Sequence, residues 1–361
     1  MQRKSDSPMT VIQSIEDVTP RWLTKVLRES GELADGEVCE VSARSGSGNW
    51  SSNARLELRY ASGSKGACPK SMFLKLVSTD ATMEDHFDDS EVRYYRSDYT
   101  GLADAPLLKC FHAAYQPGSY HVLLEDVSET HQPAAFVSPT LAYGKKLAEA
   151  TAVLHSHYWA TLRSIAMPTE AQVLRYIDVA KPGLKNVLED PKSTLKPHWP
   201  ELLRRFFVEH PQKLLTRLQF PNGFSRVHGD LNGFNILVPK GREGSIYLID
   251  RQPFEWSLRT WLGVSDLAFP LISDWTPEER REHELEILQC YHEKLRQLGI
   301  EDYAWEDVWG DYKLCSAMGI YNAIEFCKHG IDEDMRDRWF SLLTRSIATL
   351  EDAGETPRKT H

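Results

Sequence analysis

Residues 227–238 read VHGDLNGFNILV, a polar segment with apolar residues on both sides. The polar part has the form H-x-D-x-x-x-x-N, from His228 to Asn235. A second apolar run, residues 246–250, reads IYLID and ends in the carboxylate of Asp250. Short runs rich in branched and aromatic residues are typical of buried β-strands. The sequence therefore predicts a polar loop and a carboxylate, each at the end of a buried run.

Phosphoryl transfer accounts for these residue types at this spacing. A carboxylate has to orient the attacking hydroxyl and accept its proton, a role that suits Asp230. Mg²⁺ prefers hard oxygen ligands and keeps several waters, so the amide of Asn235 and the carboxylate of Asp250 suffice to hold it beside nucleotide phosphates. We expect His228 to hold the loop through backbone hydrogen bonds. Each residue alone is typical of a turn or cap, but together they predict a catalytic Asp230 and a metal site at Asn235 and Asp250.

The first third of the chain is rich in strand patterns. Residues 41–44 and the alternating run 54–60 predict two strands. The connection between them, residues 45–53, is rich in turn residues and contains Gly46 and Gly48. Glycine permits a close backbone approach to a ligand, although two glycines are also typical of a plain hairpin turn.

A lysine interrupts the next predicted strand, residues 71–77, whose other positions are almost all apolar. A charge in such a run needs a partner, because burying it alone is costly. Glu91 lies in the middle of a predicted helix over residues 84–97. Lys75 and Glu91 would each be solvated surface charges in most proteins, but the apolar surroundings of Lys75 favour a functional role.

After residue 128 the patterns become mostly helical, with a capping box at Thr276 to Glu279. A β-rich part followed by an α-rich part predicts an α+β, two-lobed fold. We expect residues 1–128 to form a nucleotide-binding N-lobe and residues 129–361 a C-lobe with the catalytic and acceptor sites. The connector 125–130 is the candidate hinge.

Composition excludes several classes of function. The chain has 361 residues and a formal net charge of -10, so nucleic acid is not expected as a partner. The six cysteines form no C-x-x-C pair, as expected for free thiols in a reducing compartment. No apolar run approaches the length of a spanning helix, and the N-terminus has no signal-peptide pattern. We therefore expect a cytoplasmic protein without a membrane partner, either monomeric or homodimeric.

The segment His228-Gly229-Asp230 with Asn235 and Ile249-Asp250 resembles the aminoglycoside phosphotransferase and choline kinase superfamily. That superfamily has a protein-kinase-like fold. Other segments are similar to its ecdysteroid-kinase-like branch, and the resemblance runs from about residue 15 to about residue 345. These segments are the first helix, the glycine loop, the glutamate helix, the hinge and the first long C-lobe helix, at residues 19–23, 46–52, 91–95, 124–127 and 154–159.

The resemblance implies roles for further residues and ATP as the phosphate donor. Lys75 would contact the α- and β-phosphates, and Glu91 would pair with it. Backbone groups near Glu125 and Val127 would bind adenine. The glycine loop would cover the phosphates with its backbone N–H groups, and its cofactor-binding residues are expected to be Gly46, Gly48, Asn49 and Ser51.

Two positions leave alternatives open. Arg251 stands where relatives often have an aromatic residue, and it could reach phosphate or pair with an acidic neighbour. Asp266 is similar to the aspartate that braces the catalytic loop in the family, but a helix cap is nearly as good an interpretation. Neither Arg251 nor Asp266 takes the place of a catalytic residue.

The acceptor is expected beside Asp230 in the C-lobe. By analogy with the family, an aromatic wall could come from Trp256, Trp261, Tyr321 and Phe326, although core packing explains any one of them better. The acidic residues 332–334 could attract a cationic antibiotic, but we interpret them as a solvated loop.

The leading hypothesis is a magnesium-dependent small-molecule kinase that phosphorylates a hydroxyl of a natural-product or steroid-like alcohol. The alternatives are an aminoglycoside- or choline-type kinase with a cationic substrate, and a nucleotide-binding regulator without turnover. A protein kinase is a weaker alternative, because the chain has H-G-D instead of H-R-D and no recognisable activation segment. The sequence does not identify the acceptor.

Overall fold

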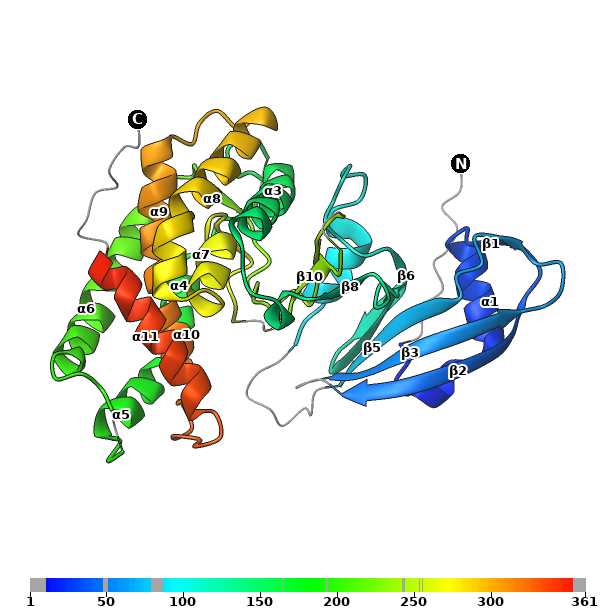
Figure 1. Cartoon of the computed structure of the whole chain (residues 1–361), viewed down its shortest axis with the longest axis horizontal. Coiled ribbons are helices and arrows are strands. Elements are labelled where there is room, and N and C mark those ends of the chain that lie inside the picture. The colour runs from blue at the N-terminus through cyan, green and yellow to red at the C-terminus, as the bar shows by residue number, and fades with distance from the viewer. Residues whose placement is uncertain are drawn as a thin grey trace.

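The computed structural model describes residues 11–47, 51–78, 87–163, 165–192, 194–241, 244–252, 254 and 256–352. A lobe built on a β-sheet is followed by a helical lobe (Figure 1). This arrangement confirms the predicted α+β, two-lobed class.

An antiparallel sheet of five strands forms the N-lobe, in the order β2-β3-β5-β7-β6. Its strands are β2 (Val38–Ser47), β3 (Ser51–Tyr60), β5 (Ser71–Ser78), β6 (Cys110–Gln116) and β7 (Ser119–Glu125). Strands β1 (Leu33–Asp35) and β4 (Lys65–Gly66) pair separately. The strand predicted over residues 71–77 is confirmed.

The first hairpin is longer than predicted. Strand pairing between β2 and β3 continues through Ser47 and Ser52, so Gly46 and Ser51 lie within strands. The predicted turn-rich connection over residues 45–53 is therefore wrong at both ends. Cross-strand hydrogen bonding extends this ladder past the turn-forming residues that suggested a loop. Gly48 and Asn49, predicted to bind the nucleotide, lie outside the described residues.

Helices cover both faces of the sheet. Helix α1 (Pro20–Glu29) begins at Thr19, whose side chain accepts a hydrogen bond from the Trp22 N–H at 3.2 Å. Its buried residues pack on Leu74 and neighbouring strand residues of one face. Helix α2 (Ser90–Arg93) continues as the π-helix η2 (Tyr94–Asp98) against the other face. Because side chains alternate along a strand, Lys75 points to the opposite face from Leu74, toward the helix that carries Glu91.

Three short strands join the two lobes. Strand β8 (His131–Pro133) follows the predicted hinge and pairs with β10 (Ile236–Pro239), which in turn pairs with β11 (Tyr247–Leu248). Strand β12 (Thr260–Leu262) pairs with β9 (Phe224–Arg226). Strands β9 and β10 enclose the H-G-D segment, and β11 leads into Asp250. The two buried runs predicted around the polar residues are therefore present as short strands.

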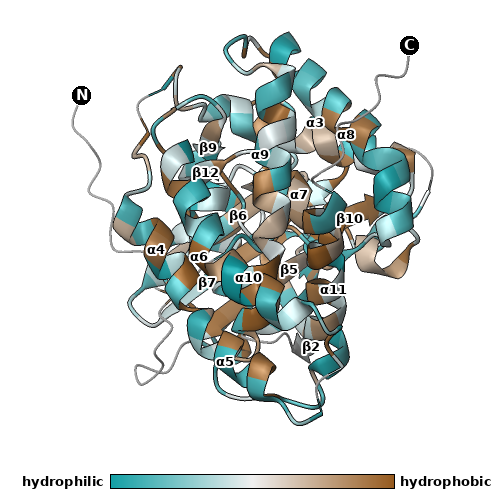
Figure 2. Ribbon diagram, turned by 90° about the vertical axis from the view of Figure 1, so that its left-hand side faces the viewer, coloured by the Kyte–Doolittle hydropathy of each residue, from teal (hydrophilic) through white to brown (hydrophobic). Residues whose placement is uncertain are grey.

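Helices build the rest of the C-lobe around one large apolar core. Figure 2 faces this lobe, with α10 near its centre, and apolar and polar stretches alternate along the ribbons. None of the described helices is both long and apolar enough to cross a bilayer. After the turn η3 (Ala134–Phe136), the helices are α3 (Leu141–His157), α4 (Glu170–Asp178), α5 (Lys181–Glu189), α6 (Trp199–Arg217), α7 (Ser265–Ser273), α8 (Pro277–Gln297), α9 (Trp305–Ala317), α10 (Gly319–Glu325) and α11 (Arg336–Asp352).

Candidate functional site

Lys75 joins the two lobes at the predicted site. Its ammonium lies 3.0 and 2.9 Å from the two carboxylate oxygens of Glu91, and it also forms a salt bridge with Asp250. Tyr120 donates a further hydrogen bond of 2.5 Å to Glu91. Burial alone would lower the pKa of Lys75, but Glu91 and Asp250 raise it above its ordinary value. A permanently charged ammonium is therefore held between the two lobes, as a contact to nucleotide phosphates requires.

Burial raises the pKa of the Glu91 carboxyl, and Lys75 opposes that rise. Glu91 is 1% exposed, so this carboxylate is buried on the sheet side of the helix and does not face solvent. Tyr120 stabilises the pair from the neighbouring strand β7 and was not identified from the sequence. Nearly all residues of that strand are buried, so its pattern does not single out Tyr120.

The loop after β9 brings Asp230 and Asn235 together. The Asn235 side-chain N–H donates to the backbone oxygen of Asp230 at 2.7 Å and to its carboxylate at 3.1 Å. Asn232 donates to the same carboxylate at 3.3 Å. Burial raises the pKa of Asp230 to about 7, with a further contribution from the charge of Asp250. A carboxylate that takes up a proton near neutral pH suits general base catalysis.

His228 connects this loop to the strand that leads into Asp250. Its Nε2 donates to the backbone oxygen of Ile249 at 2.9 Å, because a carbonyl can only accept, so its Nδ1 is left to accept from the Asp230 N–H at 3.4 Å. Burial lowers the pKa of His228 to about 4, so the imidazole is neutral at physiological pH. The Ile249 N–H donates to the backbone oxygen of Asn235 at 2.9 Å. These bonds agree with the structural role predicted for His228.

Asp266 braces the same loop from helix α7. Its carboxylate accepts hydrogen bonds from the backbone N–H groups of His228 at 2.6 Å and Gly229 at 2.9 Å, and it lies 3.1 Å from the imidazole of His155. Burial opposes its ionisation, but these hydrogen bonds lower the pKa of Asp266 below its ordinary value. The position before α7 is occupied by Val264, so bracing, and not a helix cap, is the role of Asp266.

Asp250 adopts a left-handed backbone conformation with φ of 63°. This conformation is uncommon outside glycine, and Asp and Asn tolerate it best. It turns the chain at the end of the buried run and leaves the carboxylate 47% exposed beside Lys75. The turn therefore presents a carboxylate where the two lobes meet.

The donor set around Asp250 and Asn235 fits magnesium. The Asn235 amide nitrogen is used by Asp230, which leaves its oxygen as a ligand, and Asp250 supplies a carboxylate. Within the described residues, no group of three or more His, Cys, Asp or Glu side chains could hold a metal by itself. Such a sparse site suits Mg²⁺, which takes its remaining ligands from water and nucleotide phosphates.

The candidate hinge is held by backbone hydrogen bonds. The Glu125 N–H donates to the Lys109 oxygen at 2.9 Å, and the Val127 oxygen accepts from Thr130 and His131. Those groups are thus engaged in holding the hinge. The Val127 N–H donates to no acceptor in the part of the chain that the structure describes, and its contact with adenine stays a prediction.

Arg251 pairs with an acidic neighbour, which decides between its two interpretations. The guanidinium is 2% exposed and lies 2.8 Å from the carboxylate of Asp98, at the end of η2. Arg226 contacts the other oxygen of Asp98 at 2.6 Å. The helix that carries Glu91 is therefore tied to the residue after Asp250. Asp98 lies 153 positions from Arg251 along the chain, so no local pattern could have paired them.

Replacing Arg251 by Leu should reduce the free energy of unfolding by about 3–5 kcal/mol, because Asp98 would lose one partner of a buried ion pair. Urea unfolding at constant pH measures this change. The double variant Arg251→Leu/Asp98→Asn should cost less than the sum of the two single changes. The exposed Arg204→Leu is the control, and additive single effects at 98 and 251 would contradict the coupling.

The four residues of the predicted aromatic wall differ in burial, and their contact with an acceptor stays a prediction. Trp261 and Tyr321 are 2% and 1% exposed and belong to the core. Trp256 is half-buried and Phe326 is 37% exposed, so these two can face a ligand. Trp261 and Tyr321 lie on the inward faces of β12 and α10, so they pack in the core.

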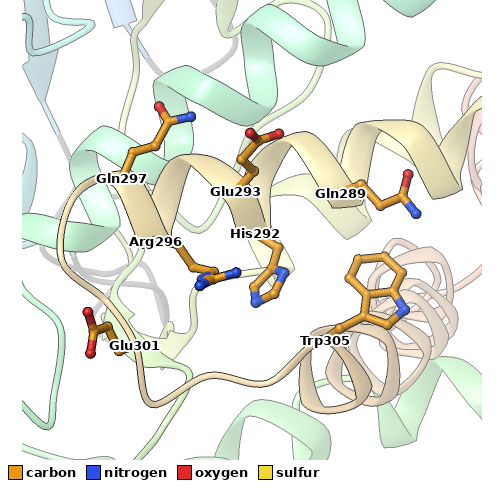
Figure 3. A pocket seen from close by; sticks show the side chains of 7 residues that line it. All are labelled: Gln289, His292, Glu293, Arg296, Gln297, Glu301 and Trp305. Carbon is orange, nitrogen blue, oxygen red and sulfur yellow. The ribbon is translucent and has the colours of Figure 1, made fainter.

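One hollow of the described structure lies away from these residues. It has a volume of about 700 Å³ and lies between the last turns of α8 and the start of α9 (Figure 3). Its lining is mostly polar, with His292 and Arg296 on the helix facing Trp305 (Figure 3). None of its lining residues belongs to the loops that carry Asp230 or Asp250. This hollow is therefore separate from the candidate site, which is defined by the contacts of Lys75, Asp230 and Asp250.

No protein-family model and no curated protein sequence matches the chain. Solved structures similar to it include spectinomycin phosphotransferase in complex with ADP and spectinomycin, at 13% identity, 92% coverage of this chain, 99% of that chain and a TM-score of 0.48. An aminoglycoside-3'-phosphotransferase of type VIII matches at 18% identity, 81% and 97% coverage and a TM-score of 0.43. An aminoglycoside phosphotransferase from Alicyclobacillus acidocaldarius matches at 10% identity, 85% and 89% coverage and a TM-score of 0.46. The contacts above, and not these distant likenesses, carry the functional assignment.

Proposed function

We propose that the chain is an ATP- and magnesium-dependent phosphotransferase that acts on a hydroxyl group of a small molecule. The observation that carries this proposal is the contact of Lys75 with both Glu91 and Asp250, beside the hydrogen-bonded pair Asp230 and Asn235. A cation for phosphates, an oxygen pair for a metal and a carboxylate base are the parts that phosphoryl transfer needs.

In the proposed reaction, Asp230 orients the acceptor hydroxyl and takes its proton. The hydroxyl oxygen forms a bond to the γ-phosphorus of ATP, and the bond between that phosphorus and the bridging oxygen breaks, so ADP leaves. Lys75 holds the donor phosphates while Glu91 fixes the position of the ammonium. Magnesium, when bound at Asn235 and Asp250, would offset the negative charge of the phosphates.

The alternatives receive less support. A regulator without turnover would not need a carboxylate with a pKa near neutrality beside the phosphate-binding groups. A cationic acceptor would be favoured by free acidic groups, but Glu333 of the acidic loop pairs with Lys192 at 3.1 Å and Arg336 at 2.9 Å. We interpret that loop as a structural element.

Incubation of the full chain with Mg-ATP and a broad panel of alcohols tests the proposal. Mass spectrometry should find one phosphate added to at least one alcohol, in an amount matched by the ADP formed. The absence of any phosphorylated product, despite tight Mg-ATP binding, would instead support the regulator.

The pH dependence of turnover should report Asp230. Activity at limiting substrate should rise as the pH increases through about 7, because the base works only after its proton is lost and burial raises its pKa to about 7. Rates measured between pH 5.5 and 9 check this. A flat profile across neutral pH would contradict the role of Asp230 as a base.

A further inference from the structure

A line of aromatic side chains runs beside the segment that follows Asp250. The rings of Phe87 and Phe254 lie 5.0 Å apart, and Phe254 stacks on Trp256 at 5.2 Å with an interplanar angle of 14°. Trp256 in turn lies 6.1 Å from Tyr176 of α4. Phe254, Trp256 and Tyr176 are only partly buried. The line thus connects the N-lobe to the C-lobe with ring surface that remains accessible.

The line continues onto the last two helices. The Tyr176 hydroxyl donates a hydrogen bond of 2.5 Å to the side-chain oxygen of Asn322 on α10. Phe326 directly follows that helix, and the Arg338 guanidinium lies 5.3 Å from its ring centre. We call Tyr176, Trp256, Asn322, Phe326 and Arg338 the aromatic cluster.

This cluster shares its electrostatic environment with the proposed base. After burial, the charges of Glu325 and Asp230 are among the causes that raise the pKa of Tyr176. The positive charge of Arg338 acts in the opposite direction to the burial that raises the pKa of Asp230. The segment that carries Trp256 also meets the loop of Asp230, because the Gln252 N–H donates to the backbone oxygen of His228 at 3.3 Å.

The charges at the cluster are unequal. Glu325 pairs with Lys328 at 2.8 Å, so its carboxylate is already compensated. Arg338 is exposed and forms no ion pair with any acidic side chain of the described residues. An anionic group would therefore find at this place a guanidinium that lies over a ring and forms no ion pair with the described acidic side chains.

We propose that the aromatic cluster holds the acceptor, and that the acceptor is a ring-bearing, mainly apolar alcohol that also carries an anionic group. Trp256 and Phe326 contact its apolar body, Arg338 binds the anionic group, and the hydroxyl lies toward Asp230. This inference rests on the proposed function, and it names the substrate class for that site. Arg338 is thus a specificity-determining residue, since a guanidinium recognises a carboxylate with paired, charge-assisted hydrogen bonds.

Matched ring alcohols test the inference. Each is prepared as a carboxylate, as its methyl ester and as the corresponding primary amine, and binding to the full chain with Mg-ADP is measured by equilibrium dialysis. The carboxylates should bind about tenfold or more tightly than the esters, because a hydrogen bond to a charged group contributes about 1.5–3 kcal/mol. The amines should bind most weakly of the three.

Variants separate charge from apolar contact. Arg338→Glu should reverse the order in favour of the amines, and Arg338→Gln should remove the preference. Trp256→Ala should weaken all three forms by a similar factor. Arg204→Glu, at an exposed position on another helix, is the matched control and should leave the order unchanged. Thermal unfolding confirms that each variant is folded.

The possible outcomes are distinct. A wild-type preference for amines, an order that Arg338→Glu leaves unchanged, or no binding in any arm would overturn the inference. Phosphate transfer from Mg-ATP is followed on the same panel. Binding with the predicted order but without any transfer would support the acceptor class and count against the proposed function. Phosphate transfer without a preference for the carboxylates would support the proposed function and count against the acceptor class.

Discussion

Replacing Asp230 by Asn should reduce turnover by about 10²–10⁴-fold, because the variant keeps the shape of the side chain but cannot accept the proton of the acceptor hydroxyl. The substrate concentration for half-maximal rate should change much less, since the phosphate contacts of Lys75 remain. Steady-state rates of ADP release with a phosphorylated alcohol from the screen measure both quantities. Asp334→Asn, at an exposed acidic position, is the control for a change of charge alone.

The same variant should be more stable than the wild type at alkaline pH. The pKa of Asp230 is raised in the folded state, so the folded protein holds a proton that the unfolded chain has lost, and the wild type loses stability as the pH rises from about 4 to about 7. The asparagine side chain does not ionise, so the variant does not lose this stability as the pH rises. Melting temperatures at pH 8 should therefore be higher for the variant and equal at pH 4. An unstable Asp230→Asn at pH 8 would mean that the carboxylate is structural.

The sequence predicted the site best where the proposed chemistry requires a set spacing between residues along the chain. The loop from His228 to Asn235 is short, so its polar groups have to lie close together whatever surrounds them. A lysine in an apolar strand needs a buried partner, and the family resemblance implied that Glu91 is that partner. The predicted lobes followed from the change of pattern along the chain.

Features built from distant residues were not predictable in this way. Asp98 and Arg251 meet only because a π-helix ends beside the strand exit, and Tyr176 meets Trp256 through the packing of α4. Trp256 and Trp261 look alike in the sequence, but one is half-buried and the other is in the core. Which aromatic residue faces a ligand depends on how β12 pairs, and composition does not determine that.

Replacing Asp250 by Asn should reduce turnover by about 10³-fold and raise the magnesium concentration needed for activity. We expect a loss of turnover of this size because one electrostatic contact to the transferring group is removed in a partly buried site. Asn is the informative substitution because it tolerates the φ of 63° that the position requires, whereas Ala adds backbone strain to the loss of charge. Magnesium titrations of the initial rate measure the effect.

Asp104 provides the matched control, because it is exposed and also has a left-handed backbone, with φ of 56°. Asp104→Ala adds only the backbone strain, whereas Asp250→Ala also removes a partner of Lys75, and only the second should lose activity. Removal of the Asp250 charge should also lower the pKa of Asp230, since that charge contributes to its rise to about 7. The loss of stability with rising pH should then still begin near pH 4 but be complete at a pH below about 7. An unchanged pH dependence would show that the two carboxylates do not interact, and the shared phosphate-binding site would lose its physical basis.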